Sequence, residues 1–508
     1  MADIVIGSGP SGIAVATALL ARGRQVVMLD GGKRLEPDRA ALRDKMAAMA
    51  PQDWSAADHT AWQAPQFATP AGQIRRYGSD FAMEAAAATF EAGADRFALR
   101  ASRAAGGLSN LWGSAILPYH PLDMAGWPVS AADLAPHYRA LGAFLPASGR
   151  PDDLAPDFPL QPAAGQHLAP SPQAGVLLDR MERARAGLAA LGITAGMART
   201  AVASGCRACG QCLHGCPWGL IWSAGGALAH LRAHPAFTYR PGAIAMRFSE
   251  TGAQAEVTLT SGETIRGERL FIGAGVLETA RLVLASRPGD AVLTLRDSQH
   301  GFLPALHLWR APRRPDRGPF HTLPQAFTEL RDPRVSPHLV HAQIYTWNEF
   351  FEQDLIANYA RRLPGSTPFF RALARRLIVA QLFLHSDHSA RVRLRLAADG
   401  RLAAQIDATG ATAIFDAAAR AMGRGLALVG LRPLSFAKRM APAGSSFHAG
   451  ATVPMAAEPG ANDSDVLGRP KGYERIHLID ASILPAIPAT TITLAVMANA
   501  HRIGTLCP

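Results

Sequence analysis

The first thirty residues alternate between short apolar runs and a turn rich in glycine. In the stretch DIVIGSGPSGIAVATALLARGRQVVMLD, residues 3–30, the apolar run IVI predicts a buried strand, and glycines follow at positions 7, 9 and 12. An Ala- and Leu-rich run of helical character comes next, and QVVML predicts a second strand that ends at Asp30. This order of strand, helix and strand predicts one βαβ unit of an α/β fold.

The glycines have the G-x-G-x-x-G spacing of dinucleotide-binding proteins. Gly7 permits a tight turn, Gly9 lets the backbone approach a pyrophosphate, and Gly12 allows the helix to pack closely on the strand. The free N–H groups of the helix N-terminus would face the phosphates, and Asp30 would accept hydrogen bonds from the adenosine ribose. The pattern does not distinguish FAD from NAD, and a glycine-rich turn in an unrelated α/β domain is the alternative.

The rest of the chain has a mixed pattern. Residues 176–192 (VLLDRMERARAGLAALG) predict a helix, whereas residues 339–347 (LVHAQIYTW) predict a strand and residues 390–407 (ARVRLRLAADGRLAAQID) a hairpin that turns at ADG. Residues 146–172 are rich in proline and predict an extended connector. The segment RALARRLIVAQLFL, residues 371–384, has the pattern of a basic amphipathic helix, either on a lipid surface or, more commonly, on a domain with one wet face.

Length and charge narrow the class of protein. A chain of 508 residues with 48% apolar and 18% charged residues is too long for one core and predicts two or three domains. The net charge of +11 comes almost entirely from arginine, and these arginines are scattered rather than grouped with aromatic residues as in a nucleic-acid groove. We therefore expect no nucleic-acid partner.

The chain carries no obvious membrane or export signal. No apolar run approaches the roughly 20 residues of a membrane-spanning helix, so contact with a membrane is expected to be peripheral at most. The N-terminus lacks the basic, apolar and small-residue regions of a secretory signal. A cytoplasmic location is expected, with export on a partner subunit as the alternative.

Four of the five cysteines lie within eleven residues. Cys206, Cys209, Cys212 and Cys216, followed by Pro217, have the C-x2-C-x2-C-x3-C-P spacing of bacterial ferredoxins. Such spacing lets the thiolates of one loop converge on one iron–sulfur cluster. Because the chain has no second run, Cys216 can close a [4Fe–4S] cluster, which we favour over a [3Fe–4S] cluster held by three cysteines. Structural zinc, which usually takes two separated C-x2-C knuckles, and disulfides are the alternatives.

The neighbours of this run have expected roles of their own. His214 is either a spare ligand or a solvent-facing side chain. Trp218 and Trp222 are expected to pack over the cluster and limit the access of water, which would tune its potential. The fifth cysteine, Cys507, is expected to be a bystander.

Four further blocks carry a family resemblance. They are RAAGGLSNLWGSAILPYHPLDMAGWP (103–128), ERLFIGAGVLETARLVLAS (268–286), SSFHAGATVPM (445–455) and IHLIDASILPAIPATTITLAVMANAHRIG (476–504). Together with the N-terminal glycines, these blocks resemble the glucose–methanol–choline (GMC) flavin oxidoreductases. The resemblance is greatest to the iron–sulfur-containing branch that includes bacterial FAD-dependent glucose and polyol dehydrogenases. It is weak over residues 290–440.

The resemblance implies that the dinucleotide is FAD. It also implies an α/β fold with a Rossmann-like FAD-binding domain, a second α+β substrate domain built on an antiparallel sheet, and an iron–sulfur cluster loop. A helix opening within AIPATTITLAVMANA would direct its positive N-terminus at the flavin. The residues that it places along FAD are Gly106, Gly107, Ser109, Asn110 and Leu111 beside the flavin ring and pyrophosphate, Ala274 and Gly275 by the adenosine half, and Asp480 near the flavin chain.

The implied organisation alternates between the domains. The segments are residues 1–145 (first part of the FAD-binding domain), 146–172 (connector), 173–236 (helical segment with the cluster loop), 237–287 (second FAD part), 288–443 (substrate-binding domain) and 444–508 (C-terminal FAD part).

His448, in SFHAG, matches the histidine that is the family's proposed base at the flavin face. An imidazole can take the proton of an alcohol hydroxyl at neutral pH while the flavin takes the hydride. The family's second polar residue, His or Asn, is replaced here by Thr491, or by Thr490 if the register slips. A threonine hydroxyl can orient an alkoxide but is a poor base. Either His448 works alone, another side chain takes over, or the reaction is not a simple alcohol oxidation.

These features predict a dehydrogenase that oxidises a hydroxyl of a sugar, polyol or related alcohol. Because a flavin accepts two electrons at once and a cluster passes them singly, the thiols favour an external acceptor, either a cytochrome, a ferredoxin-like protein or a small subunit. The alternatives are a reductase of the same fold fed through the cluster, an electron-transfer module without its own substrate, and a flavoprotein with structural zinc.

Overall fold

The structure is a computed structural model that describes residues 1–63, 75–84, 86–91, 99–161, 167–287, 289–309, 320–407 and 410–508. These residues form helices and four sheets, so the expected α/β class is confirmed. Parts of the predicted segments 1–145, 146–172 and 288–443 lie outside the described residues, and the division into domains stays a prediction. No helix within the described ranges is long and apolar enough to cross a membrane.

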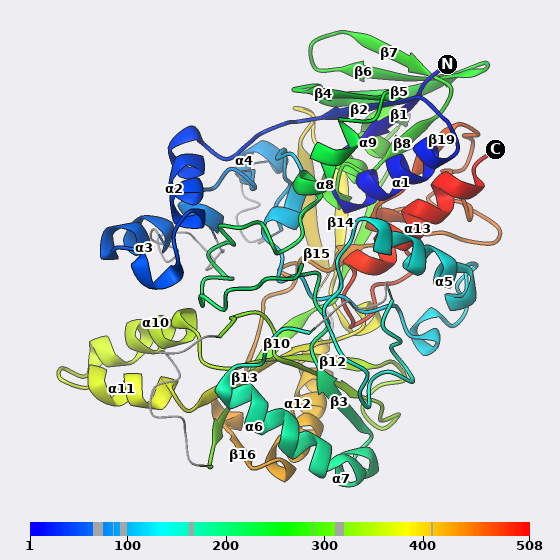
Figure 1. The fold of residues 1–508 in the computed structure, drawn as a ribbon. Helices are drawn as coiled ribbons and strands as arrows, with labels where there is room; N and C mark the ends of the chain where they lie inside the picture. The colour runs from blue at the N-terminus through cyan, green and yellow to red at the C-terminus, as the bar shows by residue number, and fades with distance from the viewer. Residues whose placement is uncertain are drawn as a thin grey trace.

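A five-stranded parallel sheet gathers strands from distant parts of the chain (Figure 1). The strands are β1 (Asp3–Ile6), β2 (Val26–Asp30), β4 (Phe237–Pro241), β8 (Leu270–Ile272) and β19 (Ile476–Leu478). Their order is β19-β8-β1-β2-β4, with every neighbouring pair parallel. Strands β1, β8 and β19 are buried along their whole length, as expected for a parallel sheet that is covered on both faces.

Helices and a small antiparallel sheet cover this layer. The elements are α1 (Pro10–Ala21), α8 (Ala224–Leu231), α9 (Val276–Ser286), α13 (Thr493–Leu506), β5 (Ala245–Thr251), β6 (Gln254–Leu259) and β7 (Thr264–Gly267). Helices α1 and α13 lie side by side (Figure 1), and a Cβ at Gly504 would come within 3.0 Å of Val15 and Ala18. The glycine therefore permits the close approach of the two helices. Helix α9 packs against β5 of the three-stranded sheet.

A larger antiparallel sheet forms the second half of the molecule. Its strands are β3 (Ile193–Met197), β10 (His300–His307), β11 (Ala326–Leu330), β12 (Val340–Tyr345), β13 (Leu377–Phe383), β16 (Leu431–Pro433) and β17 (Arg439–Met440). The order is β16-β10-β13-β12-β11-β3, with β17 also beside β10. Every described pairing in it is antiparallel.

The two faces of this sheet differ because side chains alternate along its strands. Every second residue of β12 belongs to an apolar core. The residues between them, His341, Gln343 and Tyr345, therefore lie on the opposite face. The helices that close the apolar core are α6 (Pro172–Arg183), α7 (Arg185–Ala190) and α12 (Ala411–Leu428).

Two expected helices differ in the structure. The helix over residues 176–192 is divided into α6 and α7, because Ala184 has φ −93° and ψ 10°, outside the helical range. A continuous helix over residues 371–384 is wrong: α11 (Thr367–Ala374) ends early, and the apolar run that follows is strand β13. Its neighbours β10 and β12 complete its hydrogen bonds.

The predicted hairpin over residues 390–407 is confirmed as β14 (Arg391–Leu396) and β15 (Leu402–Asp407). It joins β9 (Leu293–Asp297) and β18 (Ala449–Gly450) in a four-stranded sheet. Its apolar side chains belong to the same core as β1 and β8 rather than to the core beneath the larger sheet. His448 directly precedes β18 of this four-stranded sheet, and its ring contacts Phe383 of the larger sheet.

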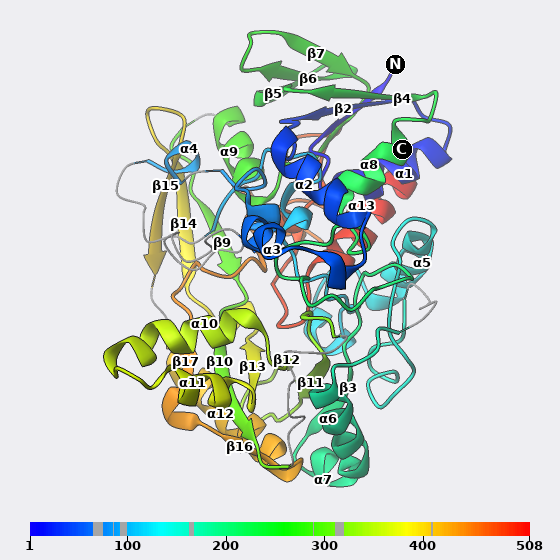
Figure 2. The same ribbon diagram turned by 60° about the vertical axis from the view of Figure 1, so that its left-hand side comes forward.

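The remaining helices lie on several sides of the molecule (Figure 2). They are α2 (Pro37–Ala47), α3 (Ala56–Gln63), α4 (Ala86–Thr89), α5 (Ala131–Ala140) and α10 (Glu349–Asn358). In Figure 2, α4 is at the left and α5 at the right, with α2 and α3 between them and α10 below. Helix α10 meets the cysteine-rich loop, because the Phe350 ring stacks on His214 with ring centroids 4.8 Å apart.

Candidate functional site

Of the three glycines in the N-terminal turn, Gly9 alone has open space beside it. Gly7 has φ +93°, and a Cβ there would overlap the carbonyl of Gly273. A Cβ at Gly12 would overlap the carbonyl of Gly7, whereas nothing among the described residues lies within 4 Å of a Cβ built at Gly9. Gly7 and Gly12 are thus required by the packing, and Gly9 faces the open side of the turn at the start of α1.

Asp30 at the end of β2 holds this turn in place. Its Oδ2 accepts from the backbone N–H and the hydroxyl of Ser8, each at 2.8 Å. Its Oδ1 accepts from the Gly32 N–H at 2.7 Å and the Tyr239 hydroxyl at 3.0 Å. Both oxygens therefore already serve the protein, and the expected contact with a ribose stays a prediction.

The segment of residues 106–111 is fastened to the glycine turn. The Gly106 N–H donates to the Ser8 hydroxyl at 2.9 Å, and a Cβ at Gly107 would lie 3.6 Å from the Cα of Gly9. The Ser109 hydroxyl donates to the Gly106 carbonyl at 2.6 Å and accepts from the Ala224 N–H at 2.9 Å. The side chain of Asn110 closes the segment through the carbonyls of Ala105 and Gly107, and Leu111 ends its 3-10 turn.

Asp480 links the turn after β8 to the end of β19. Its Oδ2 accepts from the Gly275 N–H at 3.0 Å and the Thr279 hydroxyl at 2.6 Å, and its Oδ1 from the Ser482 N–H at 2.9 Å. Burial raises the pKa of this carboxyl. Ala274 lies beside Gly275 in the same turn. The predicted dinucleotide residues are thus brought to the carboxyl ends of neighbouring parallel strands, where α/β sheets bind ligands.

His448 lies against the polar face of the larger sheet. Its ring stacks on Phe383 with centroids 4.9 Å apart and planes 21° apart. The backbone carbonyl of His448 accepts from the Ser298 N–H at 2.8 Å, and its backbone N–H donates to the Ser446 hydroxyl at 3.2 Å. The buried Nδ1 has no hydrogen-bond partner among the described residues. Burial lowers the pKa of His448 to about 3, helped by nearby His341 and His300, so the imidazole is neutral at physiological pH.

A row of side chains on that sheet was not predicted from the sequence. Sheet register pairs Phe383 of β13 with His300 of β10 on one side and His341 of β12 on the other, and pairs His341 with Glu329 of β11. The His300 and His341 rings lie 5.5 and 5.9 Å from the Phe383 ring. Three imidazoles, including His448, therefore surround one phenyl ring. The available signal was the polar residue at every second position of the strand LVHAQIYTW.

Thr491 is occupied by a backbone contact. Its hydroxyl oxygen accepts from the Leu117 N–H at 2.8 Å, and the side chain is buried. The neighbouring Thr490 hydroxyl is also buried and has no partner within the described part of the chain. Among the described residues, neither threonine hydroxyl is hydrogen-bonded to His448.

The comparison with solved structures supports the fold. No protein-family model and no curated protein matches the sequence. Among solved structures, pyridoxine 4-oxidase from Mesorbium loti matches with a TM-score of 0.61 and 18% identity, over 99% of this chain and 98% of that one. The chain has the fold of that oxidase. The likeness spans both the parallel sheet with its glycine turn and the larger antiparallel sheet.

The four predicted cysteines line one pocket. Cys206, Cys209, Cys212 and Cys216 border a space of about 380 Å³, part of it open to solvent. Burial raises the pKa of the Cys209 thiol to about 12 and of the Cys212 thiol to about 11, and also raises that of Cys206. Without a metal these three thiols would stay protonated, and a metal would displace the protons.

Aromatic side chains surround the pocket differently from expectation. Trp218 lines it and stacks on Trp54 with ring centroids 5.6 Å apart. Trp222 lies away from the pocket lining and donates from Nε1 to the Phe144 carbonyl. The expectation of a solvent-facing His214 is wrong, because its side chain is buried against Phe350. Cys507 is buried at the end of α13, where its sulfur accepts a hydrogen bond from Arg22, and it does not line the pocket. This agrees with its expected role as a bystander.

A connection joins this pocket to the segment of residues 106–111. The buried Arg76 donates to the Trp112 carbonyl at 2.8 Å and lies close enough to Cys212 and Cys216 for their charges to interact. Trp112 donates from Nε1 to the Trp222 carbonyl at 2.8 Å, and the two indole rings lie 5.9 Å apart. The cysteine run is therefore linked to the predicted flavin segment through Arg76, which also donates to the Leu111 carbonyl, and its neighbour Tyr77, whose N–H donates to the His214 carbonyl at 2.7 Å.

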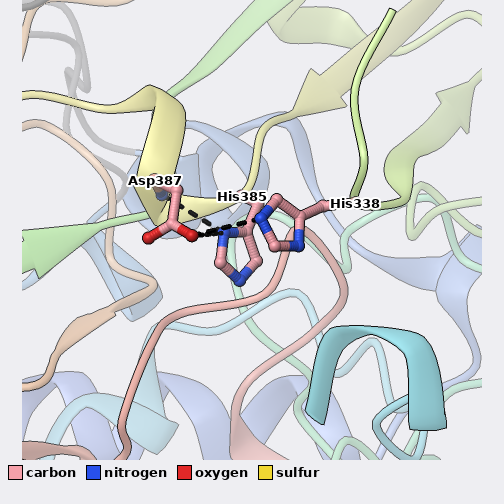
Figure 3. A group of neighbouring side chains, drawn as sticks. All are labelled: His338, His385 and Asp387. Carbon is pink, nitrogen blue, oxygen red and sulfur yellow. Dashed lines mark hydrogen bonds and ion pairs between the residues drawn. The ribbon is translucent and has the colours of Figure 1, made fainter. Parts of the chain in front are cut away.

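One further group of side chains brings three ligand atoms together. Among the described residues, only His338, His385 and Asp387 place three His, Cys, Asp or Glu ligand atoms within 4.8 Å of one another (Figure 3). The two imidazoles are stacked, with centroids 3.6 Å apart and planes 12° apart. Ring nitrogens direct their lone pairs within the ring plane, so two parallel rings cannot both point at one ion at about 2.0–2.1 Å. The group is built for hydrogen bonding rather than for a metal ion.

Proposed function

We propose that the chain is a GMC-type flavin oxidoreductase that oxidises a hydroxyl group with FAD as cofactor. The observation that carries this proposal is the likeness to pyridoxine 4-oxidase, an enzyme named for oxidation at one position of its substrate, over nearly the full length of both chains. The motif blocks at residues 103–128, 445–455 and 476–504 support it independently, because they resemble the GMC family.

The residues present fit a dinucleotide. Gly9 faces open space where a side chain would otherwise stand, and the segments at residues 106–111 and 274–275 meet at the same strand ends. When bound, FAD would supply the hydride acceptor. The neutral His448 would accept the hydroxyl proton, and its unpartnered Nδ1 is an atom at which that proton could be held.

We further propose that the cysteine pocket holds an iron–sulfur cluster, of the [4Fe–4S] type rather than [3Fe–4S]. All four thiols border one space. The ferredoxin-like run favours a cluster over structural zinc, which usually takes two separated C-x2-C knuckles.

In this proposal electrons leave through the pocket to an external acceptor, a cytochrome, a ferredoxin-like protein or a small subunit. The contacts around Arg76 support transfer between the two centres, because Arg76 donates to the Leu111 carbonyl of the flavin segment and its neighbour Tyr77 donates to the His214 carbonyl of the cysteine run. The substrate would be a sugar, a polyol or a related alcohol. An aromatic alcohol is included in that last class because Phe383 lies beside His448.

The test combines metal analysis with anaerobic reduction. Protein purified without air should contain FAD, iron and acid-labile sulfide, and Cys212→Ser should lose the iron and sulfide but keep the FAD. Cys507→Ser is the matched control and should keep all three. Among D-glucose, sorbitol, glycerol and benzyl alcohol, at least one should bleach the flavin without oxygen. Zinc in place of iron would overturn the cluster, and reduction only by an electron donor added through the cluster would favour the reductase alternative.

A further inference from the structure

Removing electrons singly creates a need for a proton path. Oxidation of an alcohol to its carbonyl compound breaks one C–H and one O–H bond and releases two electrons and two protons, and a one-electron acceptor takes the electrons without the protons. One proton leaves the hydroxyl during flavin reduction, and the other leaves the flavin when it is reoxidised. Both must cross from a buried site to water. This argument rests on the proposed function.

The inner end of a path lies in the unpredicted row of side chains. His341 and Glu329 are both buried, with 2.6 Å between Nδ1 and Oε1. With its proton on Nδ1, His341 leaves the lone pair of Nε2 available. That Nε2 and the second oxygen of Glu329, Oε2, have no hydrogen-bond partner in the described ranges. The pair therefore carries one unpartnered acceptor on each of its two side chains.

Asp123 is the next titratable group toward the surface after Glu329, whose charge affects it. It lies in a 3-10 turn, Pro121–Met124, and its Oδ1 accepts from the Leu339 N–H at 3.2 Å. Its Oδ2 is buried and unpartnered among the residues described here. Burial, with a smaller contribution from the nearby charge of Glu329, raises the pKa of Asp123 to about 7. The carboxyl thus exchanges its proton near neutral pH.

His338 spans the distance from Asp123 to the surface. Its Nδ1 lies 3.8 Å from Oδ1 of Asp123, and its Nε2 lies 3.1 Å from Oδ2 of Asp387 (Figure 3). The side chains of Asp123, His338 and Asp387 are 0%, 21% and 45% exposed, so exposure rises along the series. The first separation is too long for a hydrogen bond, so the route requires the two side chains to move closer when a proton passes.

We propose that these groups form a proton exit route, in which protons pass from His341 and Glu329 through Asp123 to His338, and from Asp387 to water. A proton arriving on one ring nitrogen of His338 allows the proton on the other to leave. Each passage moves the His338 proton from Nε2 to Nδ1, and a flip of the ring restores the starting tautomer before the next proton passes.

Three further side chains lie around His338 and Asp387, and they are His385, His388 and Arg296. His385 stacks on His338, and burial lowers the pKa of His385 to about 3, so this neighbour stays neutral. His388 meets it edge-on with centroids 5.9 Å apart and bonds to the Ser336 hydroxyl. Arg296 pairs with the other oxygen of Asp387, Oδ1, at 3.2 Å, whereas Oδ2 lies 3.1 Å from Nε2 of His338 and 3.5 Å from Nδ1 of the neutral His385.

The test follows protons and flavin in the same anaerobic stopped-flow experiment, with a pH-indicator dye and the fastest alcohol of the panel above. In the wild type, proton release should keep pace with flavin bleaching, at one proton for each flavin reduced. His338→Gln should delay proton release at least tenfold behind bleaching, and added imidazole should restore it. Asp387→Asn, at the surface, should show a similar delay. His388→Gln is the control and should behave as the wild type.

The outcomes separate the two proposals. Wild-type proton release in both His338→Gln and Asp387→Asn, with bleaching intact, would overturn the exit route alone. A delay that imidazole does not relieve would indicate a structural effect and would also count against it. A wild-type protein that no alcohol bleaches would overturn the proposed function, and the route with it.

Discussion

Replacing Asp123 by asparagine is expected to stabilise the protein at neutral and alkaline pH. The carboxyl is 0% exposed, and its Oδ2 has no partner in the part of the chain that the structure describes. Burial raises its pKa to about 7, with a contribution from the nearby Glu329. Asparagine has nearly the same shape and carries no charge, so it retains the Oδ1 contact with the Leu339 N–H without the cost of burying a carboxylate.

The size of the effect follows from the two pKa values. In the unfolded chain the carboxyl loses its proton near pH 3.9, whereas in the folded protein it keeps the proton until about pH 7. Between these values the unfolded state binds fewer protons, so the free energy of unfolding falls as the pH rises. A difference of about 3 pKa units at 1.36 kcal/mol each gives about 4 kcal/mol as a ceiling. Asp123→Asn should avoid this loss above pH 7 and gain nothing near pH 4.

The assay is urea unfolding of wild type and Asp123→Asn between about pH 5 and about pH 8. The variant's advantage should widen with pH. Asp332→Asn is the matched control of opposite sign, because hydrogen bonds from Arg334 lower the pKa of Asp332. Its stabilising contribution is fully present above the unfolded pKa of about 3.9, so this variant should be less stable than wild type by the same amount across the whole pH range of the assay. An Asp123→Asn protein less stable than wild type at pH 8, or an advantage independent of pH, would refute the reasoning.

Three other substitutions test the site. Gly12→Ala should fold without flavin absorbance, since its Cβ would overlap the Gly7 carbonyl, whereas Gly175→Ala, with no described atom within 4 Å, should keep the absorbance. Arg76→Gln should lower the midpoint potential of the iron–sulfur centre in an EPR-monitored titration, because it removes a positive charge beside two of the thiols; an unchanged potential would contradict this. His448→Gln should bind flavin normally but slow its reduction by alcohol about 10²–10⁴-fold in stopped flow. Reduction at the wild-type rate would exclude His448 as the proton acceptor.

The parts of the fold that could be predicted depend on local sequence. The βαβ unit at residues 3–30 is specified by glycine spacing and by short apolar runs, all within one stretch of chain. The hairpin at residues 390–407 is likewise specified by alternation and a turn. Strand β13 was not predictable in this way, since an apolar run beside arginines suits a helix or a strand. Two strands distant in sequence, β10 and β12, decide between them by hydrogen bonding.

The residues of the candidate site likewise fall into those that local sequence identifies and those that only the fold brings together. Cysteine spacing and the SFHAG motif identify Cys206 to Cys216 and His448 without any knowledge of the fold. Glu329, His341 and His338 carry no motif, and each is an isolated polar residue in its own segment. They become neighbours through the antiparallel register of β11 and β12 and the loop before β12. A buried strand with polar residues at alternate positions is the one local sign that such a row exists.

The order of strands in the parallel sheet has a consequence for biosynthesis. The glycine turn is made first by the ribosome, but β19, which completes one edge of that sheet, and α13, which packs on α1, come from the last part of the chain to be made. A nascent chain that stops before residue 476 therefore exposes the apolar sides of β8 and α1 to water. The proposed dinucleotide site is therefore complete only after residues 476–506 have been made, and before that the exposed apolar surfaces favour aggregation.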